Sequence, residues 1–326
     1  MSPLAVVPSS PLSGRELAKL VREGLFLGAD DCYSMAEGPG CTLFLRHGVE
    51  LGPDVPSVCS IGAFDGVHVG HRKLASEALE DAARRSVPCV AVTFDPDPAD
   101  ILVGPRESMR LLETRDRVRA LASLGFDAVV AFRFDGDLAK TPYSDFVTSR
   151  LSRLVRPVSL HVGTNFRLGH RGLGNVAALS ALGETLGFDV FGHDLVEVDG
   201  RSVSATRVRA LLHEGDVSAA TRLLGRLHFV RGVVSHGRGE GTSFGFPTAN
   251  LLVDKATCMP AEGVYACLAY SGGTAWPAAV NVGAPPSFSD PNPHFLEANL
   301  IGFEGDLYGL EMVILFVSWL RASRTF

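Results

Sequence analysis

The sequence has few cysteines, and none of them stands at the spacing of a metal site. Its six cysteines are scattered over 326 residues without a CxxC motif. Zinc sites and disulfide frameworks usually show closely spaced cysteines, so the sequence indicates neither. The pattern favours free and mostly buried thiols in a reducing compartment, at Cys32, Cys41, Cys59, Cys89, Cys258 and Cys267.

Long apolar segments are also lacking. No run approaches the roughly 20 apolar residues that cross a bilayer, and residues 1–20 lack the cationic and apolar segments of a secretion signal. Lys and Arg total 30 against 36 Asp and Glu, which gives a net charge of −6. This balance disfavours a broad basic surface for nucleic acid, although it leaves room for a local basic pocket that binds a small phosphorylated ligand. We expect a cytoplasmic protein with neither a membrane nor a nucleic acid as its partner.

Apolar strand-like runs alternate with amphipathic helix-like stretches from Val55 onward. Such alternation is typical of an α/β domain, in which helices cover both faces of a parallel sheet. The expected strands are 55–62, 87–94, 126–134, 157–163 and 188–198, and the expected helices are 71–85, 113–125 and 175–187.

Helical periodicity then ends, and six short β-rich runs separated by Gly, Pro and Asn predict a small antiparallel six-stranded barrel. The chain is 46% hydrophobic and long enough for two such cores. We therefore expect an α/β domain over 55–225 and a barrel over 226–326. An N-terminal extension over 1–54 precedes them, and the sequence does not indicate its role. Within it, the amphipathic residues 13–27 predict a helix that Ser13 could cap.

A glycine-rich turn with two histidines, GAFDGVHVGH, follows the first expected strand at 62–71. Ligands of open parallel sheets bind beyond the carboxyl ends of the strands. Gly62 and Gly70 allow close backbone approach, and the helix start that follows attracts phosphate. His68 and His71, one turn apart, can both direct N–H groups at a polyphosphate. The alternative is that these histidines merely cap the helix.

A second polar segment, RSVSATRVRALL, lies at the far end of the same expected domain. It places Ser204, Thr206, Arg207 and Arg209 at a helix start, where hydroxyl and guanidinium groups can hold phosphate oxygens. An ordinary N-cap followed by an exposed basic face is the alternative. No nucleophilic Cys or Ser with a paired base is nearby. A bound nucleotide is therefore expected to react by direct attack of a substrate phosphate on its α-phosphorus.

Four segments together resemble the adenylyltransferase module of bacterial bifunctional riboflavin kinase/FAD synthetases, in the same order: GAFDGVHVGH, VTFDPDP, VGTNFRLGHRGLGN and VSATRVRALLHEGDVSAATRLLGR. The resemblance implies a Rossmann-like nucleotidyltransferase domain that uses ATP to adenylate FMN to FAD. It implies an ATP-binding set of Gly62, Phe64, His68, Gly70, His71, Ser204, Thr206 and Arg209, in which the two histidines and the arginine act on the phosphate chain. It also places Asn165 and Phe166 beside FMN.

Two positions depart from the pattern of that family. Pro96-Asp97-Pro98 stands where the family often has Pro-His-Pro, and Ala205 stands within a family Ser-Ser-Thr stretch. A carboxylate repels a polyphosphate, and alanine lacks a hydroxyl donor. Both changes therefore predict weaker adenylyl transfer.

The expected barrel opens with a second glycine-rich segment, SHGRGEGTSFGFPTAN. Gly239, Gly241 and Gly245 make a loop able to lie against a nucleotide, while Pro247 stiffens the entry to the next strand. Thr248 and Asn250 share one face of that strand, and their oxygen atoms suit Mg²⁺ that also binds nucleotide phosphates. A hairpin whose turn is satisfied by these side chains is the alternative.

Glu297, on a later strand, is a candidate acceptor for the proton of an attacking hydroxyl, or else a solvent-facing acid. Its surroundings resemble the riboflavin kinase module of the same family through SHGRGEGTSFGFPTANL, MPAEGVYA, AAVNVG, LEANLIGFEGDLYG and ILFVSWLR. The resemblance implies phosphorylation of riboflavin to FMN, with Glu297 as the base that activates the riboflavin hydroxyl. It implies Mg-ATP binding by Pro247, Thr248 and Asn250.

Two departures affect this module as well. The segment 283–287 lacks a Thr-Arg-Pro-Thr-like stretch, and the sequence ends at Phe326, where the family continues into a C-terminal helix. Weaker riboflavin binding is the expected consequence. Two other functions therefore stay open: a different HxGH nucleotidyltransferase with an accessory barrel, and a degenerate flavin-binding or regulatory homologue. The combination of Thr248 and Glu297 argues against a different nucleotidyltransferase. Asp97 supports a degenerate homologue. The sequence does not indicate an oligomeric state.

Overall fold

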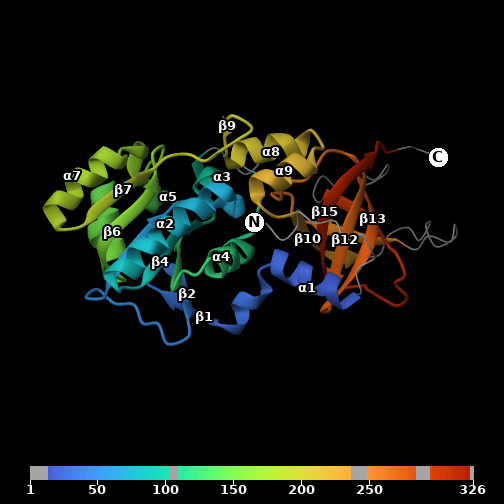
Figure 1. The fold of residues 1–326 in the computed structure, drawn as a ribbon, viewed down its shortest axis with the longest axis horizontal. Coiled ribbons are helices and arrows are strands. Elements are labelled where there is room, and N and C mark those ends of the chain that lie inside the picture. The colour runs from blue at the N-terminus through green and yellow to red at the C-terminus, as the bar shows by residue number, and fades with distance from the viewer. Residues whose placement is uncertain (1–13, 103–108, 236–247, 284–293, 324–326) are drawn as a thin grey trace. The chain divides into compact units, whose positions relative to one another are not determined.

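The computed structural model describes residues 14–102, 109–235, 248–283 and 294–323, and Figure 1 labels their helices and strands. The chain divides into two compact units, each described by itself. The sheet unit comprises residues 26–108 and 113–203, and the barrel unit comprises residues 1–25, 109–112 and 204–326. The domain limits expected from the sequence stay predictions.

A seven-stranded sheet forms the centre of the sheet unit (Figure 1). Its strand order is β1-β2-β5-β4-β3-β6-β7, in which β5, β4, β3, β6 and β7 run parallel, while β2 is antiparallel to both of its neighbours. The strands are β1 (Tyr33–Gly38), β2 (Cys41–Arg46), β3 (Pro56–Ile61), β4 (Cys89–Asp95), β5 (Ala128–Arg133), β6 (Arg156–Gly163) and β7 (Asp189–His193).

The central strands of this sheet are buried along nearly their whole length. Every residue is buried from 57 to 61 in β3 and from 89 to 94 in β4. Continuous burial of this kind requires cover on both faces of a parallel sheet, as the sequence predicted. Helix α2 (Val69–Arg85) contacts β3, β4 and β6, and α4 (Thr114–Ser123) contacts β2 and β5.

The other elements of the sheet unit are short except for one helix. α7 (Val176–Leu186) contacts β7 and begins at Asn175, whose side chain accepts a hydrogen bond from the Ala178 amide at 2.9 Å. The short elements are η2 (Leu27–Asp31), η3 (Asp65–Val67), α3 (Pro98–Leu102), α5 (Gly136–Lys140), α6 (Tyr143–Asp145), η4 (Phe146–Arg150), η5 (Leu151–Arg153), η6 (His170–Gly172), β8 (Glu197–Val198) and β9 (Arg201–Ser202).

The β1–β2 hairpin lies in the extension to which the sequence analysis assigned only a helix. It is anchored at one end by Tyr33, whose hydroxyl donates hydrogen bonds to the carbonyls of Phe126 at 2.6 Å and Ala122 at 3.0 Å. Arg46 donates to Asp127 at 2.9 Å. Residues 33–46 thereby extend the sheet beyond β5.

The barrel unit contains the closed six-stranded antiparallel barrel that the sequence predicted. Its strand order is β10-β11-β14-β13-β12-β15. Side chains alternate strictly between buried and partly buried along β12, as expected for a strand whose one face fills a barrel. The strands are β10 (His228–Ser235), β11 (Ala249–Val253), β12 (Gly263–Ser271), β13 (Thr274–Val282), β14 (His294–Leu300) and β15 (Glu311–Arg321).

Three helices complete the described part of the barrel unit. α1 (Gly14–Gly24) confirms the helix expected over 13–27 and contacts β12 and β13, while Ser13 lies outside the described residues. α8 (Ala205–His213) packs on α9 (Val217–Leu224), which contacts β10 and β15.

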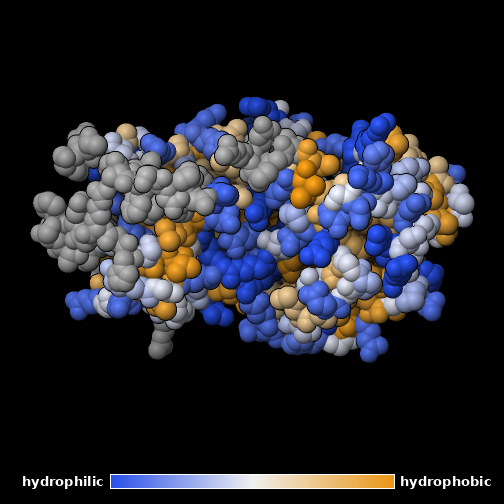
Figure 2. All heavy atoms as spheres, turned by 180° about the vertical axis from the view of Figure 1, so that it is seen from behind, coloured by the Kyte–Doolittle hydropathy of each residue, from blue (hydrophilic) through white to orange (hydrophobic). Residues whose placement is uncertain are grey.

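The surface and the cysteines agree with the expectations from composition. Figure 2 shows apolar side chains interspersed among hydrophilic ones on the face that it presents. None of the helices in the described part of the chain is long and apolar enough to cross a membrane. All six cysteines are free thiols, and all but Cys32 are buried.

Candidate functional site

Three loops of the sheet unit meet at one edge of the sheet. β3 lies between β4 and β6, and the three strands are parallel, so the loops that follow them leave the same edge side by side. The chain passes from β3 to β4 on one side and later returns to β6 on the other. This is the topological switch point at which open α/β sheets bind ligands.

The loop after β3 has a constrained backbone. Phe64 and Val67 have positive φ angles of 54° and 41°, and Gly66 lies between them at 76°. Phe64 is fully buried, and a Cβ atom at Gly62 would lie only 3.3 Å from its ring. Left-handed non-glycine residues are costly and cluster at functional sites, so the turn carries strain that the surrounding sheet must hold.

His68 and His71 are stacked at the start of α2, with ring centroids 3.7 Å apart. His68 is the N-cap of α2, and its Nδ1 atom accepts a hydrogen bond from the His71 amide at 3.3 Å. The capping role named as the alternative is therefore present. Because Nδ1 accepts, the neutral ring carries its proton on Nε2, which leaves that N–H as a possible phosphate donor. A Cβ at Gly70 would come within 3.1 Å of the His68 ring, so glycine makes room for this stack.

Both histidines are neutral in this environment. Burial lowers the pKa of His68 to about 4. Burial also lowers the pKa of His71 well below its usual value, and the charges of His68 and Arg117 lower it further. In the absence of bound phosphate, the two rings therefore present neutral N–H groups rather than cations.

The loop after β6 carries Asn165 and Phe166 on the neighbouring strand. Asn165 is exposed, and Phe166 is partly buried against the sheet core. The Phe166 amide donates to the Gly163 carbonyl at 2.9 Å, which closes a tight turn directly after β6. The structure thus brings these two residues to the same edge as His68 and His71.

The loop after β4 alters the expectation about Asp97. Its carboxylate accepts a hydrogen bond from the Ala99 amide at 2.9 Å and lies 3.7 Å from the Arg117 guanidinium. A buried arginine of α4 therefore faces this charge, while the weaker adenylyl transfer expected from the acid stays a prediction. Arg117 was not predicted from the sequence, because it is twenty residues further along the chain and carries no motif signal of its own.

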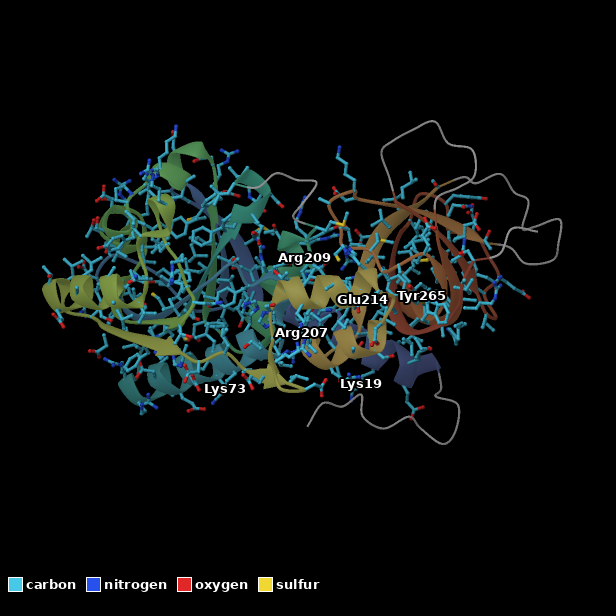
Figure 3. All side chains as sticks on the ribbon, turned by 90° about the horizontal axis from the view of Figure 1, so that it is seen from above. Lys19, Lys73, Arg207, Arg209, Glu214 and Tyr265 are labelled. Carbon is cyan, nitrogen blue, oxygen red and sulfur yellow. The ribbon has the colours of Figure 1, made fainter. Side chains whose placement is uncertain are left out.

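The second segment predicted to bind phosphate lies, from Ser204 onward, in the barrel unit. Ser204 is the N-cap of α8 and accepts a hydrogen bond from the Arg207 amide at 3.2 Å, while Thr206 is exposed. Arg209 donates through Nε to the Met109 carbonyl, and Figure 3 shows Arg207 and Arg209 both on α8. That these residues join His68 at one nucleotide stays a prediction.

The barrel brings two predicted kinase residues into direct register. Asn250 of β11 lies opposite Glu297 of β14, and Glu297 lies opposite Asn281 of β13. Leu251 and Leu296, their neighbours along the strands, are buried. The Asn250–Glu297–Asn281 row therefore points away from the barrel interior. Asn281 was not singled out from the sequence, although the quoted segment AAVNVG contains it.

Thr248 precedes Asn250 by two residues and is partly buried. A hydroxyl and an amide oxygen next to a carboxylate form a donor set that fits Mg²⁺, which prefers oxygen ligands. The other predicted members of this site, Gly239, Gly241, Gly245 and Pro247, lie outside the described residues.

Two family models match the chain in order. The model for FAD synthetase matches residues 53–207, and the model for riboflavin kinase matches residues 224–326. A solved structure described as a macrolide-efflux protein from Streptococcus pneumoniae superposes with a TM-score of 0.74 at 26% identity. That match covers 84% of this chain and 92% of the other.

Curated relatives carry one common description, bifunctional riboflavin kinase/FMN adenylyltransferase. The protein from Escherichia coli strain K12 is 31% identical over 281 residues, which are 86% of this chain and 89% of that protein. The protein from Pseudomonas fluorescens is 34% identical over 269 residues, which are 82% and 86% of the two chains. With both modules matched and most of each relative covered, the chain belongs to the bifunctional riboflavin kinase/FMN adenylyltransferase family.

Proposed function

We propose that this chain phosphorylates riboflavin to FMN at the Asn250–Glu297 pair and adenylates FMN to FAD at the turn after β3, with ATP as the co-substrate of both reactions. The observation that carries this proposal is the presence of two separate polar constellations in one chain. One is the outward-facing register pair of the barrel. The other is the His68–His71 stack at the switch point of the sheet.

In the kinase reaction, the Glu297 carboxylate accepts the proton of the riboflavin 5′-hydroxyl as its oxygen attacks the γ-phosphorus of ATP. Glu297 is exposed, so a substrate hydroxyl can reach it. Thr248 and Asn250 supply the oxygen ligands for Mg²⁺. When bound, the magnesium ion neutralises phosphate charge at this site.

In the adenylyl transfer, a phosphate oxygen of FMN attacks the α-phosphorus of ATP, and the bond to pyrophosphate breaks. His68 donates Nε2–H and His71 donates a ring N–H to phosphate oxygens, which stabilises the departing charge. Gly62, Phe64 and Gly70 shape the turn around the nucleotide.

Substrate contacts from the other segments complete this proposal. Ser204, Thr206 and Arg209 add phosphate contacts from α8, and Asn165 with Phe166 lies beside the flavin. A cytoplasmic location and the two domain limits stay predictions.

The two rival functions differ in their products. A different HxGH nucleotidyltransferase would leave riboflavin unchanged, and the adjacent Asn250 and Glu297 speak against it. A degenerate homologue would bind flavin without converting it, and the pairing of Asp97 with Arg117 removes one argument for that function.

Incubation of the purified protein with riboflavin and Mg-ATP, followed by chromatography of the flavins, tests the proposal. Formation of FMN and then FAD is the expected result. His68→Ala should lower FAD formation by about 100-fold and leave FMN formation intact, because general acid–base and phosphate-donor groups typically contribute on that order. Glu297→Gln should block FMN formation yet still convert supplied FMN to FAD. Loss of both activities in either variant would contradict the assignment of separate sites.

A further inference from the structure

Arg117 is a fully buried cation beside the candidate adenylyltransferase site. Its side chain is 1% exposed and that of Asp97 is 9% exposed, and Nη1 lies 3.7 Å from the Asp97 carboxylate. Nη2 donates to the Phe94 carbonyl at the end of β4 and reaches the Thr114 hydroxyl at 3.5 Å. The guanidinium therefore links α4 to the loop that follows β4. A guanidinium stays charged at every working pH, so this is a permanent buried charge.

The hydrogen-bonding capacity of this guanidinium is not filled. Among the residues that the structure describes, Nε and Nη1 of Arg117 are buried without a hydrogen-bond partner, and so is Nδ1 of His71. Unfilled buried donors are costly, and a hydrophobic replacement of a buried ion pair often preserves or improves stability. Packing and stability alone are therefore a poor explanation for an arginine at this position. Such groups in native proteins more often mark functional sites.

The charge of Arg117 acts on His71. The pKa of His71 is lowered first by burial, then by His68 and then by Arg117. α4, which carries Arg117, also contacts η3 (Asp65–Val67), the turn directly before His68 and His71. The charged and titratable groups on the elements packed here include His68 and Arg72 of α2, Asp65 of η3, Asp95 of β4, Asp97 and Asp100 at the start of α3, and Asp116 and Arg117 of α4.

We propose that Arg117 is a positioning residue for adenylyl transfer, which neutralises Asp97 at the start of α3 and fixes α4 against the turn that leads to His68 and His71. This inference rests on the proposed function of the turn after β3 and extends it to α4. It also explains how Asp97 is accommodated beside the candidate phosphate site. Arg117 and Asp97 act as one unit, in which the acid is tolerated near phosphate because the arginine compensates it.

The double variant Arg117→Met/Asp97→Asn tests this proposal without leaving an unpaired buried charge. Its His71 ring should titrate at a higher pH than in the wild type, because a nearby positive charge has been removed. Ring NMR signals assigned with His71→Gln report this directly. The kcat/KM for FMN adenylation should fall on the order of tenfold from imprecise placement of the turn, while riboflavin phosphorylation stays unchanged. Arg117→Lys, which keeps the charge, should retain the wild-type titration of His71 and most of the activity.

A matched control lies two residues further along α4. Arg119 pairs with Asp30 at 2.7 Å in a more exposed position, so Arg119→Met/Asp30→Asn should change neither the His71 titration nor adenylation. Unchanged titration and unchanged kcat/KM in the Arg117→Met/Asp97→Asn variant would overturn the inference and leave Arg117 a structural residue. Failure of the proposed function looks different, because His68→Ala would then also leave FAD formation intact.

Discussion

Nδ1 of His161 lies 2.9 Å from Nε2 of His193, and this contact joins two carboxylates through two imidazoles. His161 Nε2 lies 3.2 Å from Asp81, and His193 Nδ1 contacts Glu77. Burial lowers the pKa of His161 and outweighs the opposing effect of its hydrogen bond to Asp81. His161 is therefore neutral: it donates Nε2–H to Asp81 and accepts at Nδ1 from His193. None of these four residues belongs to a motif that the sequence analysis used.

The first prediction follows from the number of protons available to the contacts that run from Asp81 through His161 and His193 to Glu77. Three contacts need three protons, whereas two neutral rings supply two and an ionised carboxylate supplies none. Burial raises the pKa of Glu77, but Lys73 and His193 outweigh burial and lower it, so the carboxylate is ionised. Glu77→Gln would supply the third proton from its amide. The free energy of unfolding of Glu77→Gln at pH 8 should therefore exceed that of the wild type by up to about 1 kcal/mol. Urea unfolding of both proteins measures the difference, and a less stable Glu77→Gln variant would contradict the missing proton.

A second prediction compares two acids that share one arginine. Arg85 contacts Asp81, whose side chain is 4% exposed, and Asp189, whose side chain is 61% exposed. Asp81 also accepts hydrogen bonds from Ser159 at 2.7 Å and from Arg84 at 3.1 Å. Asp81→Asn should lower the free energy of unfolding at pH 7 by about 2–4 kcal/mol, because it leaves buried donors unpaired. Asp189→Asn should cost less than about 1 kcal/mol. Equal costs in urea unfolding would contradict this distinction between the two acids.

A third prediction concerns His228 in the barrel. Burial lowers its pKa to about 3, assisted by Arg226, and Nε2 donates to the Cys258 carbonyl at 2.9 Å. The unfolded chain binds a proton below about pH 6.5 and the folded chain does not, so stability falls as the pH drops from 6.5 toward 3. His228→Gln removes this penalty. When the pH drops from 7.5 to 5, the free energy of unfolding of the wild type should therefore fall by about 2 kcal/mol more than that of His228→Gln. Unfolding midpoints of the barrel at the two pH values measure this difference. An unchanged pH slope would mean that His228 is protonated in the folded barrel.

The pattern of apolar runs, helix-like stretches and turn residues was sufficient to predict the parallel sheet and the barrel. It was not sufficient to predict the contacts that assemble each site. The six barrel strands and the parallel strands are apolar runs bounded by turn residues, a signal that is local in the sequence. The β1–β2 hairpin was missed because YSMAEG is mostly exposed and carries no alternating apolar face. The i, i+2 spacing placed Thr248 and Asn250 on one face, yet the register of Asn250 against Glu297 depends on long-range pairing. The pairing of Asp97 with Arg117 likewise arises only when α4 packs against β2 and β5 and Arg117 reaches the end of β4.

The last prediction concerns two glycines that differ in the space around them. Gly169 and Gly187 both have positive φ angles, 71° and 82°. A Cβ at Gly169 would lie 2.4 Å from the Tyr143 backbone nitrogen, whereas a Cβ at Gly187 would meet open space. Gly187→Ala should cost only about 1 kcal/mol of stability, the usual cost of a left-handed alanine. It should leave the KM for FMN unchanged.

Gly169→Ala must instead displace the backbone of the loop that carries Asn165 and Phe166, because backbone atoms of Tyr143 cannot move aside. We expect its KM for FMN in adenylation to rise about tenfold or more, since small displacements of positioning groups are costly. Its rate of riboflavin phosphorylation should equal that of the wild type, because the barrel residues are untouched. Steady-state adenylation kinetics with FMN, run beside Gly187→Ala, measure the difference. If the two alanine variants bind FMN equally well, the loop after β6 does not contact the flavin, and the role proposed for Asn165 and Phe166 fails.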